Sequence, residues 1–204
     1  MYLAASYYYK QAKSYLQRAV IMTKDNQKIW VEAGYETFAK EGIAGLKVEA
    51  LARKTGKSKS SFYHFFADME VFTEVLLQQH LHSSKEIAEK AKNCKKMVPD
   101  MLNLLLNAKQ HILFNRQLRI LRHIPQFNNC FQKAHLPVEN AFLNLWAEAL
   151  GLAGNTYLAR LLLNLTVENF YLRITEETLT YEWLTAYLNE IRFMVAEMHK
   201  NNPK

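Results

Sequence analysis

Hydrogen-bond donors are concentrated in one short stretch of the chain, residues 47–66 (KVEALARKTGKSKSSFYHFF). Lysines, an arginine, serines, a tyrosine and a histidine lie there beside three phenylalanines, and Glu49 is the one acidic residue of the stretch. Phosphate oxygens accept hydrogen bonds, so a surface that binds a phosphate backbone needs donors of this kind. The stretch therefore favours an anionic partner, with nucleic acid or a membrane surface as the leading options.

The charge of the whole chain has the same bias. The 204 residues include 26 Lys and Arg against 19 Asp and Glu, which gives a net charge of +7. Residues 1–66 hold 11 of the basic and 5 of the acidic side chains, so nearly all of the excess lies in the first third. The anionic partner is therefore expected to bind there.

Three helices must position the donors. Apolar residues recur with helical spacing from Asp25 onward, and Gly42 predicts the end of this first helix. A short second helix is predicted up to Gly56, and Ser58 is placed to cap a third. The third helix gathers its phenylalanines on one face, and its polar side chains lie opposite: Lys59, Ser60, Tyr63 and His64. This is the anatomy of a helix-turn-helix.

In the order and spacing of its apolar positions, glycines and aromatic cluster, the sequence resembles the DNA-binding domain of tetracycline-repressor-type (TetR/AcrR) transcriptional regulators. The similarity runs through FAKEG, VEALARKTG and KSKSSFYHFF and covers about residues 25–80. It implies a homodimeric regulator that binds a pseudo-palindromic operator in double-stranded DNA, usually as a repressor, and that a small-molecule ligand releases. The residues expected to bind DNA are Lys47, Lys57, Ser58, Lys59, Ser60, Ser61, Tyr63 and His64.

Four residues depart from the family pattern. Lys47 stands where a hydroxyl residue usually caps the second helix, and Ser60 where glycine is common. Ala67 replaces a frequent proline, and Met69 a frequent lysine. These departures affect the expected affinity and leave a second hypothesis open. In it, the chain is a dimeric helical ligand-binding or adaptor protein whose helix-turn-helix is degenerate and whose lysines are an ordinary solvated face.

The rest of the chain also has a helical pattern, although Pro125 and Pro137 punctuate it. We therefore predict an all-α fold, with a three-helix DNA-binding domain at residues 25–80 (motif 47–66) and a helical effector-binding and dimerisation domain at 81–204. The last two helices are apolar on two faces, so each needs cover on two sides. A homodimer through these helices supplies that cover, and a fully buried core helix in a monomer is the alternative. The expected dimer residues are Leu158, Leu162, Leu165, Leu184, Leu188, Ile191 and Val195.

Large apolar side chains on the C-terminal helices suggest a pocket for the small-molecule effector. They are also the residue types of a plain core, so both interpretations stay open. The candidate ligand-binding residues are Met101, Leu105, Phe114, Phe142, Trp146 and Phe170. The pattern does not identify the effector.

Enzymatic and metal-binding functions have little support. His80 and His82 are two residues apart, hence on different helix faces, and no carboxylate completes a metal set. No nucleophile elbow or phosphate-cradling glycine loop occurs. We therefore expect no catalytic residue, metal or cofactor. Cys94 and Cys130 are too few for a disulfide framework, which favours the cytoplasm.

No run approaches the roughly 18 apolar residues that span a bilayer, so no membrane partner is expected. Residues 1–24 are treated as an N-terminal extension or arm. They carry three consecutive tyrosines, four basic residues and a second methionine, Met22. They are either a basic arm or helix, or an extension upstream of a natural start at Met22. A helix at the membrane surface is a more distant alternative for this segment.

Overall fold

The computed structural model describes residues 25–200, and helices make up most of this range without any strand. The all-α prediction is therefore confirmed for the described residues. The expected arm at residues 1–24 lies outside them. None of the described helices is both long and apolar enough to cross a membrane.

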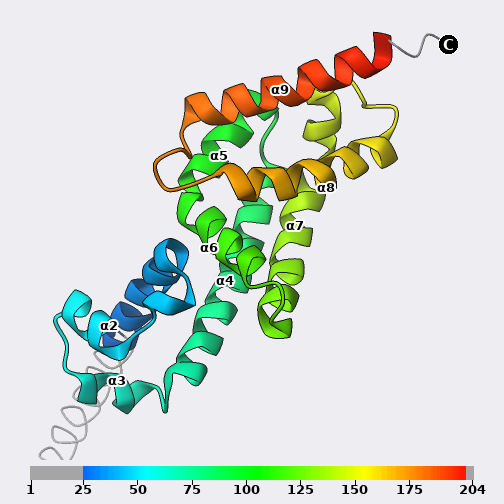
Figure 1. The fold of residues 1–204 in the computed structure, drawn as a ribbon. Coiled ribbons are helices and arrows are strands. Elements are labelled where there is room, and N and C mark those ends of the chain that lie inside the picture. Colours follow the sequence, from blue (N-terminus) through cyan, green and yellow to red (C-terminus); the bar gives the residue numbers. More distant parts are fainter. Residues whose placement is uncertain (1–24, 201–204) are drawn as a thin grey trace, which may run out of the picture.

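The N-terminal unit is built from one long helix and two short ones. The leading helix covers residues 25–41 and is followed by Gly42, whose φ of 68° lies in the left-handed region. A short 3-10 turn, η1 (Ile43–Gly45), leads into α2 (Val48–Thr55), and α3 (Lys59–Phe65) follows after a turn. Figure 1 shows these elements together at one end of the molecule.

The C-terminal unit is a bundle of longer helices. Its elements in chain order are α4 (Met69–Lys92), the short helical turn η2 (Met97–Met101), α5 (Leu102–Asn107), α6 (Lys109–Ile120), α7 (Pro125–Ala149), α8 (Thr156–Arg173) and α9 (Tyr181–Lys200). Pro125 and Pro137 are both expected to interrupt the helical pattern; Pro125 lies at the start of α7, but Pro137 lies inside that helix. In Figure 1, α4 runs from the N-terminal unit into the bundle, and α9 lies at the end far from α3.

Local sequence signals set the ends of the helices around the turn. Gly56 ends α2 with a left-handed φ of 66°, which glycine adopts without the steric cost of a Cβ. The Ser58 side chain accepts a hydrogen bond from the backbone N–H of Ser61 at 3.2 Å, so the predicted cap of α3 is confirmed. At the start of α2, Lys47 makes no side-chain cap. Asp68 caps α4 by accepting from Val71 N at 2.8 Å.

An aromatic cluster fixes the orientation of α3. Phe62 is fully buried and meets the ring of Trp30 edge-on, with centroids 5.3 Å apart. Phe62 also contacts Phe66 and Phe72, in each case with centroids 5.1 Å apart. Such contacts prefer tilted and edge-to-face geometries, so they restrain the rotation of α3 as well as burying apolar area.

The two units share one continuous core. Phe38 of the leading helix packs on Phe114 of α6, with ring centroids 4.3 Å apart, and lies 5.9 Å from Phe127 of α7. The expected domain boundary between residues 80 and 81 falls within α4. Because these rings pack on one another and α4 runs through both units, α6 is in direct contact with the leading helix.

Candidate DNA interface and internal cavity

The eight predicted DNA-binding residues all lie on α3 or in the turns before α2 and α3. Six are exposed, whereas Lys57 and Ser61 are half-buried. Tyr63 is 56% exposed although its neighbour Phe62 is fully buried, so α3 presents one polar face to solvent. That face also carries the exposed side chains of Lys59, Ser60 and His64.

Two lysines of this surface, Lys57 and Lys59, have polar partners on other helices. Lys59 Nζ lies 2.9 Å from Oε1 of Glu49 on α2, and this hydrogen bond raises the pKa of Lys59 and lowers that of Glu49. Lys57 donates to Oδ1 of Asn26 at 3.0 Å. An exposed pair such as Lys59–Glu49 contributes at most about 1 kcal/mol, so a phosphate group can displace the carboxylate.

Lys54, part of the same basic stretch, points toward the leading helix instead. Its Nζ lies 3.1 Å from Glu36 and donates to Oγ1 of Thr37 at 3.2 Å. The hydrogen bond from Lys54 is the main cause of the lowered pKa of Glu36. Lys54 therefore ties α2 to the leading helix and is not part of the exposed face of α3.

Residues 31–76, which span this helix-turn-helix, match the profile of the family described as bacterial regulatory proteins, tetR family. This part of the chain is therefore similar to the DNA-binding domain of TetR-family transcriptional regulators. Proteins of this family act by binding double-stranded DNA and are not enzymes. Among curated proteins, none is similar enough in sequence to count as a relative.

Solved structures of this family have a similar fold. A transcriptional regulator of the TetR/AcrR family from Aquifex aeolicus superposes with a TM-score of 0.56 and 17% identity, over 85% of this chain and 99% of that one. A protein described as a TetR-family regulator from Mesorhizobium loti gives a TM-score of 0.50 and 15% identity, over 84% and 97% of the chains. At these identities the similarity concerns the fold.

An internal cavity of about 130 Å³ lies among the helices of the C-terminal unit. Five of the six candidate ligand-binding residues line it: Met101, Leu105, Phe142, Trp146 and Phe170. The sixth, Phe114, is not among the lining residues, because it packs between Tyr35 and Phe38 at the junction with the leading helix. The volume is close to that of an apolar cavity that holds one benzene ring, about 150 Å³.

Sequence reasoning missed the polar groups in the cavity wall. They are His111 and Asn115 of α6, His135 of α7, Thr166 and Tyr171 of α8, and Tyr187 of α9. His111 and Asn115 are one helical turn apart and both are buried, so they interrupt the apolar side of α6. Polar residues four apart on a core-facing stripe are the signal that could have identified His111 and Asn115.

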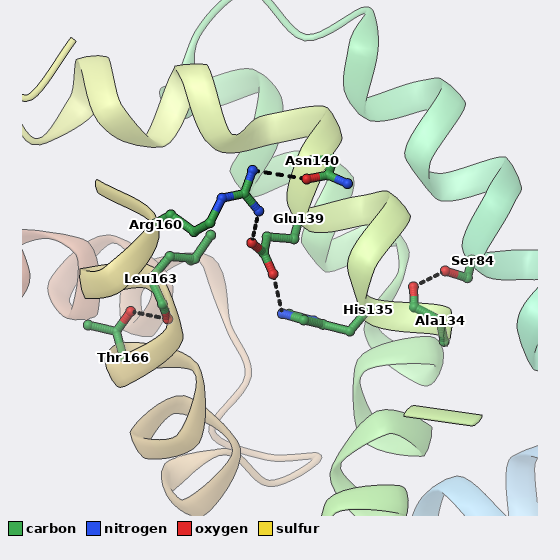
Figure 2. A network of polar contacts seen from close by, with 8 residues as sticks. All are labelled: Ser84, Ala134, His135, Glu139, Asn140, Arg160, Leu163 and Thr166. Atoms are coloured by element: carbon green, nitrogen blue, oxygen red, sulfur yellow. Dashed lines mark hydrogen bonds and ion pairs between the residues drawn. The ribbon is translucent and has the colours of Figure 1, made fainter. Parts of the chain in front are cut away.

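The carboxylate of Glu139 lies between the side chains of His135 and Arg160 (Figure 2). Glu139 is buried on α7, pairs with Arg160 of α8, and has its Oε2 3.5 Å from Nε2 of His135. Arg160 also donates to Oδ1 of Asn140 at 3.1 Å. Burial lowers the pKa of His135, which Glu139 only partly opposes, so the imidazole is neutral near pH 7. On the other side of α7, Ser84 of α4 donates to the carbonyl of Ala134.

The apolar residues of α8 and α9 divide into two sets. Five of the seven expected dimer residues are buried within the subunit: Leu162, Leu184, Leu188, Ile191 and Val195. Leu158 is half-buried, and Leu165 is 65% exposed. The exposed apolar face of these helices consists of Tyr157, Leu161, Leu165, Leu172, Phe193, Met194 and Met198. The last two helices are thus apolar on two sides, as the pattern indicates, but the more regular stripe packs inward.

Within residues 25–200, the structure groups no three His, Cys, Asp or Glu side chains in a way that would hold a metal ion.

Proposed function

We propose that this chain is a TetR-family transcriptional regulator, a homodimeric repressor that inserts α3 into the major groove of a pseudo-palindromic operator. The observation that carries the proposal is the exposed polar face of α3 above the buried ring of Phe62. Tyr63 and His64 are placed to reach base edges, and the lysines and serines around them to bind phosphates. The proposed contact residues are the eight predicted above. Since the target is chromosomal DNA, we place the protein in the cytoplasm.

The exposed apolar face of α8 and α9 is the proposed dimer interface. Its seven large side chains include Leu172, which is 81% exposed, and a second copy of the chain would cover them. A two-fold dimer would present two copies of α3, as a palindromic site requires. Figure 1 places α9 at the opposite end of the molecule from α3, so a partner subunit bound there leaves α3 free for DNA.

Release from the operator is assigned to a small molecule in the internal cavity. The cavity is lined by residues of α6, including Ile112, and the neighbouring Phe114 packs on the leading helix. A ligand that shifts α6 would therefore move the leading helix and, through Trp30 and Phe62, also α3. This gives the ligand different contacts in the DNA-binding and released states, which coupling requires.

Selection of bound sequences from a random duplex pool tests the proposal. We expect a palindromic consensus, and an affinity that falls steeply as salt rises because lysine–phosphate contacts release counterions. A pool without enrichment would refute operator binding and support the dimeric adaptor hypothesis. The mass of the free protein, measured by light scattering, tests the homodimer separately.

A further inference from the structure

Four buried polar side chains connect the leading helix to the cavity. The phenol oxygen of Tyr35 lies 2.7 Å from Nδ1 of His80 on α4, and Nε2 of His80 lies 2.9 Å from Oδ1 of Asn115. The same phenol oxygen lies 3.4 Å from Nδ1 of His111. The two imidazole rings are stacked, with centroids 4.1 Å apart. His111 and Asn115 are also cavity-lining residues.

The protons of this cluster can be assigned in order. An amide oxygen only accepts hydrogen bonds, so Nε2 of His80 carries the proton that is donated to Asn115. Burial lowers the pKa of His80 to about 4, so the ring is neutral and its Nδ1 is an acceptor. Tyr35 must therefore donate its hydroxyl proton to His80.

The assignment leaves one acceptor without a donor. With its own proton given to His80, the Tyr35 oxygen accepts from Nδ1–H of His111. Burial also lowers the pKa of His111, with neighbouring His80 and His135 adding to the effect, so the ring is neutral and Nε2 bears a lone pair. That atom is buried, and no group within residues 25–200 bonds to it. A buried unpaired acceptor is unfavourable because it has lost its hydrogen bonds to water, and a donor on a ligand would remove that penalty.

We propose that the cavity binds a small, uncharged, mostly apolar molecule, of the size of one aromatic ring, that donates a hydrogen bond from a hydroxyl or N–H group to Nε2 of His111. The proposal rests on the effector role of the cavity and adds the chemical class of the effector. A charged ligand is disfavoured because the wall offers no free counter-charge: the nearby carboxylate of Glu139 is already paired with Arg160.

Three probes of similar size separate the contributions to binding. Phenol donates a hydrogen bond, anisole only accepts one, and toluene does neither. Calorimetric titration of the wild-type full chain should show phenol binding about five- to tenfold more tightly than anisole or toluene, the effect of one hydrogen bond. Equal affinities for phenol and anisole, or the absence of phenol binding, would overturn the proposal. In ¹⁵N spectra of histidine-labelled protein, phenol should shift the Nε2 resonance of His111 and leave that of exposed His82 unchanged.

Two variants locate the acceptor. His111→Phe keeps an aromatic ring in the cavity wall and should lose the preference for phenol while still binding toluene. His123→Phe alters an exposed residue before α7 and should keep the preference. A His111→Phe protein that retains a phenol preference contradicts the assignment. If this variant does not fold, the wild-type affinities and the ¹⁵N shift decide.

Operator binding measured in the same samples separates this proposal from the proposed function. If the protein binds the selected duplex but does not bind phenol more tightly than anisole, the proposed ligand class is wrong and the proposed regulator function is unaffected. If phenol binds as expected but never releases the duplex, the ligand class stands and effector release through this cavity is wrong.

Discussion

Gly34 of the leading helix lies directly against the ring of Phe72 on α4: a Cβ built on Gly34 would stand 2.4 Å from Cζ of Phe72. A side chain at this position must push the two helices apart or displace a fully buried ring. We expect Gly34→Ala to lower the free energy of unfolding by about 1–3 kcal/mol, the usual cost of overpacking. Urea denaturation measures this change.

Gly154→Ala is the matched control for that substitution. A Cβ at Gly154 meets no atom within 4 Å, and its φ is not in the positive range. We expect its unfolding midpoint to stay close to that of the wild type. If Gly34→Ala were equally neutral, the close approach of the leading helix to α4 would be incorrect.

The Lys59–Glu49 pair predicts opposite effects of two substitutions on operator affinity. Lys59→Ala removes a phosphate contact and should weaken binding and reduce the slope of log affinity against log salt by about 1. Glu49→Gln removes the carboxylate that competes with phosphate and should strengthen binding. Because both side chains are exposed, neither change should alter the melting temperature appreciably. Anisotropy titrations at several salt concentrations measure these affinities. If both variants bound the operator as tightly as the wild type does, Lys59 would lie outside the interface.

Tyr63→Phe tests the base-reading face without changing charge. The ring of Tyr63 stays edge-on to Phe62, with centroids 5.5 Å apart, so the variant should fold and dimerise normally. Loss of the hydroxyl should weaken binding to the selected operator by roughly fivefold, the effect of one hydrogen bond, and leave binding to random duplex unchanged. A uniform loss on both duplexes would mean that the hydroxyl contacts phosphate.

Short-range rules explain why the helix-turn-helix could be predicted from sequence. Gly56 and Ser58 act through their own backbone and side-chain geometry, which depends little on the rest of the fold. Pro137 shows the limit of such rules: it removes one backbone donor, but the packing of α7 against its neighbours keeps the helix continuous.

Which of the expected dimer and cavity residues are exposed or buried could not be predicted from the sequence, because this depends on tertiary structure. Leu165 and Leu188 have the same chemistry, and both belong to apolar stripes on their helices, yet one is exposed and the other buried. Helical periodicity shows that a face is apolar but not which neighbour covers it. The proposed acceptor role of His111 could not be predicted from the sequence either, because it depends on the positions of Tyr35 and His80 in two other helices.

The buried histidines predict that stability falls in mild acid. Burial lowers the pKa of His80 to about 4 in the folded protein, whereas an unfolded histidine titrates near its ordinary value of 6.5. Below pH 6.5 the unfolded chain binds a proton at His80 that the folded protein does not bind. The contribution of this histidine to the free energy of unfolding is therefore fully present above pH 6.5 and is lost as the pH falls. The free energy of unfolding should decline by roughly 1.4 kcal/mol per pH unit for each such histidine, down to about pH 4 for His80.

Urea midpoints at pH 7.5, 6.5 and 5.5 test this decline before most carboxylates titrate. His82→Gln removes an exposed histidine from the same helix and should leave the slope unchanged. A flat profile down to pH 5 would show that folding does not lower the pKa of His80, so that its ring takes up a proton in mild acid in the folded protein as well.

A charge on the exposed face of α8 should dissociate the proposed dimer. Leu165 is 65% exposed in the single subunit, so Leu165→Glu costs little in the monomer but would place an unpaired carboxylate in an apolar interface. Light scattering should give the mass of one subunit for this variant. Gln126→Glu adds the same charge at an exposed position on α7 and should remain a dimer. Since an operator with two half-sites needs both copies of α3, Leu165→Glu should also lose high operator affinity. A variant that stays dimeric would require an interface elsewhere on the molecule.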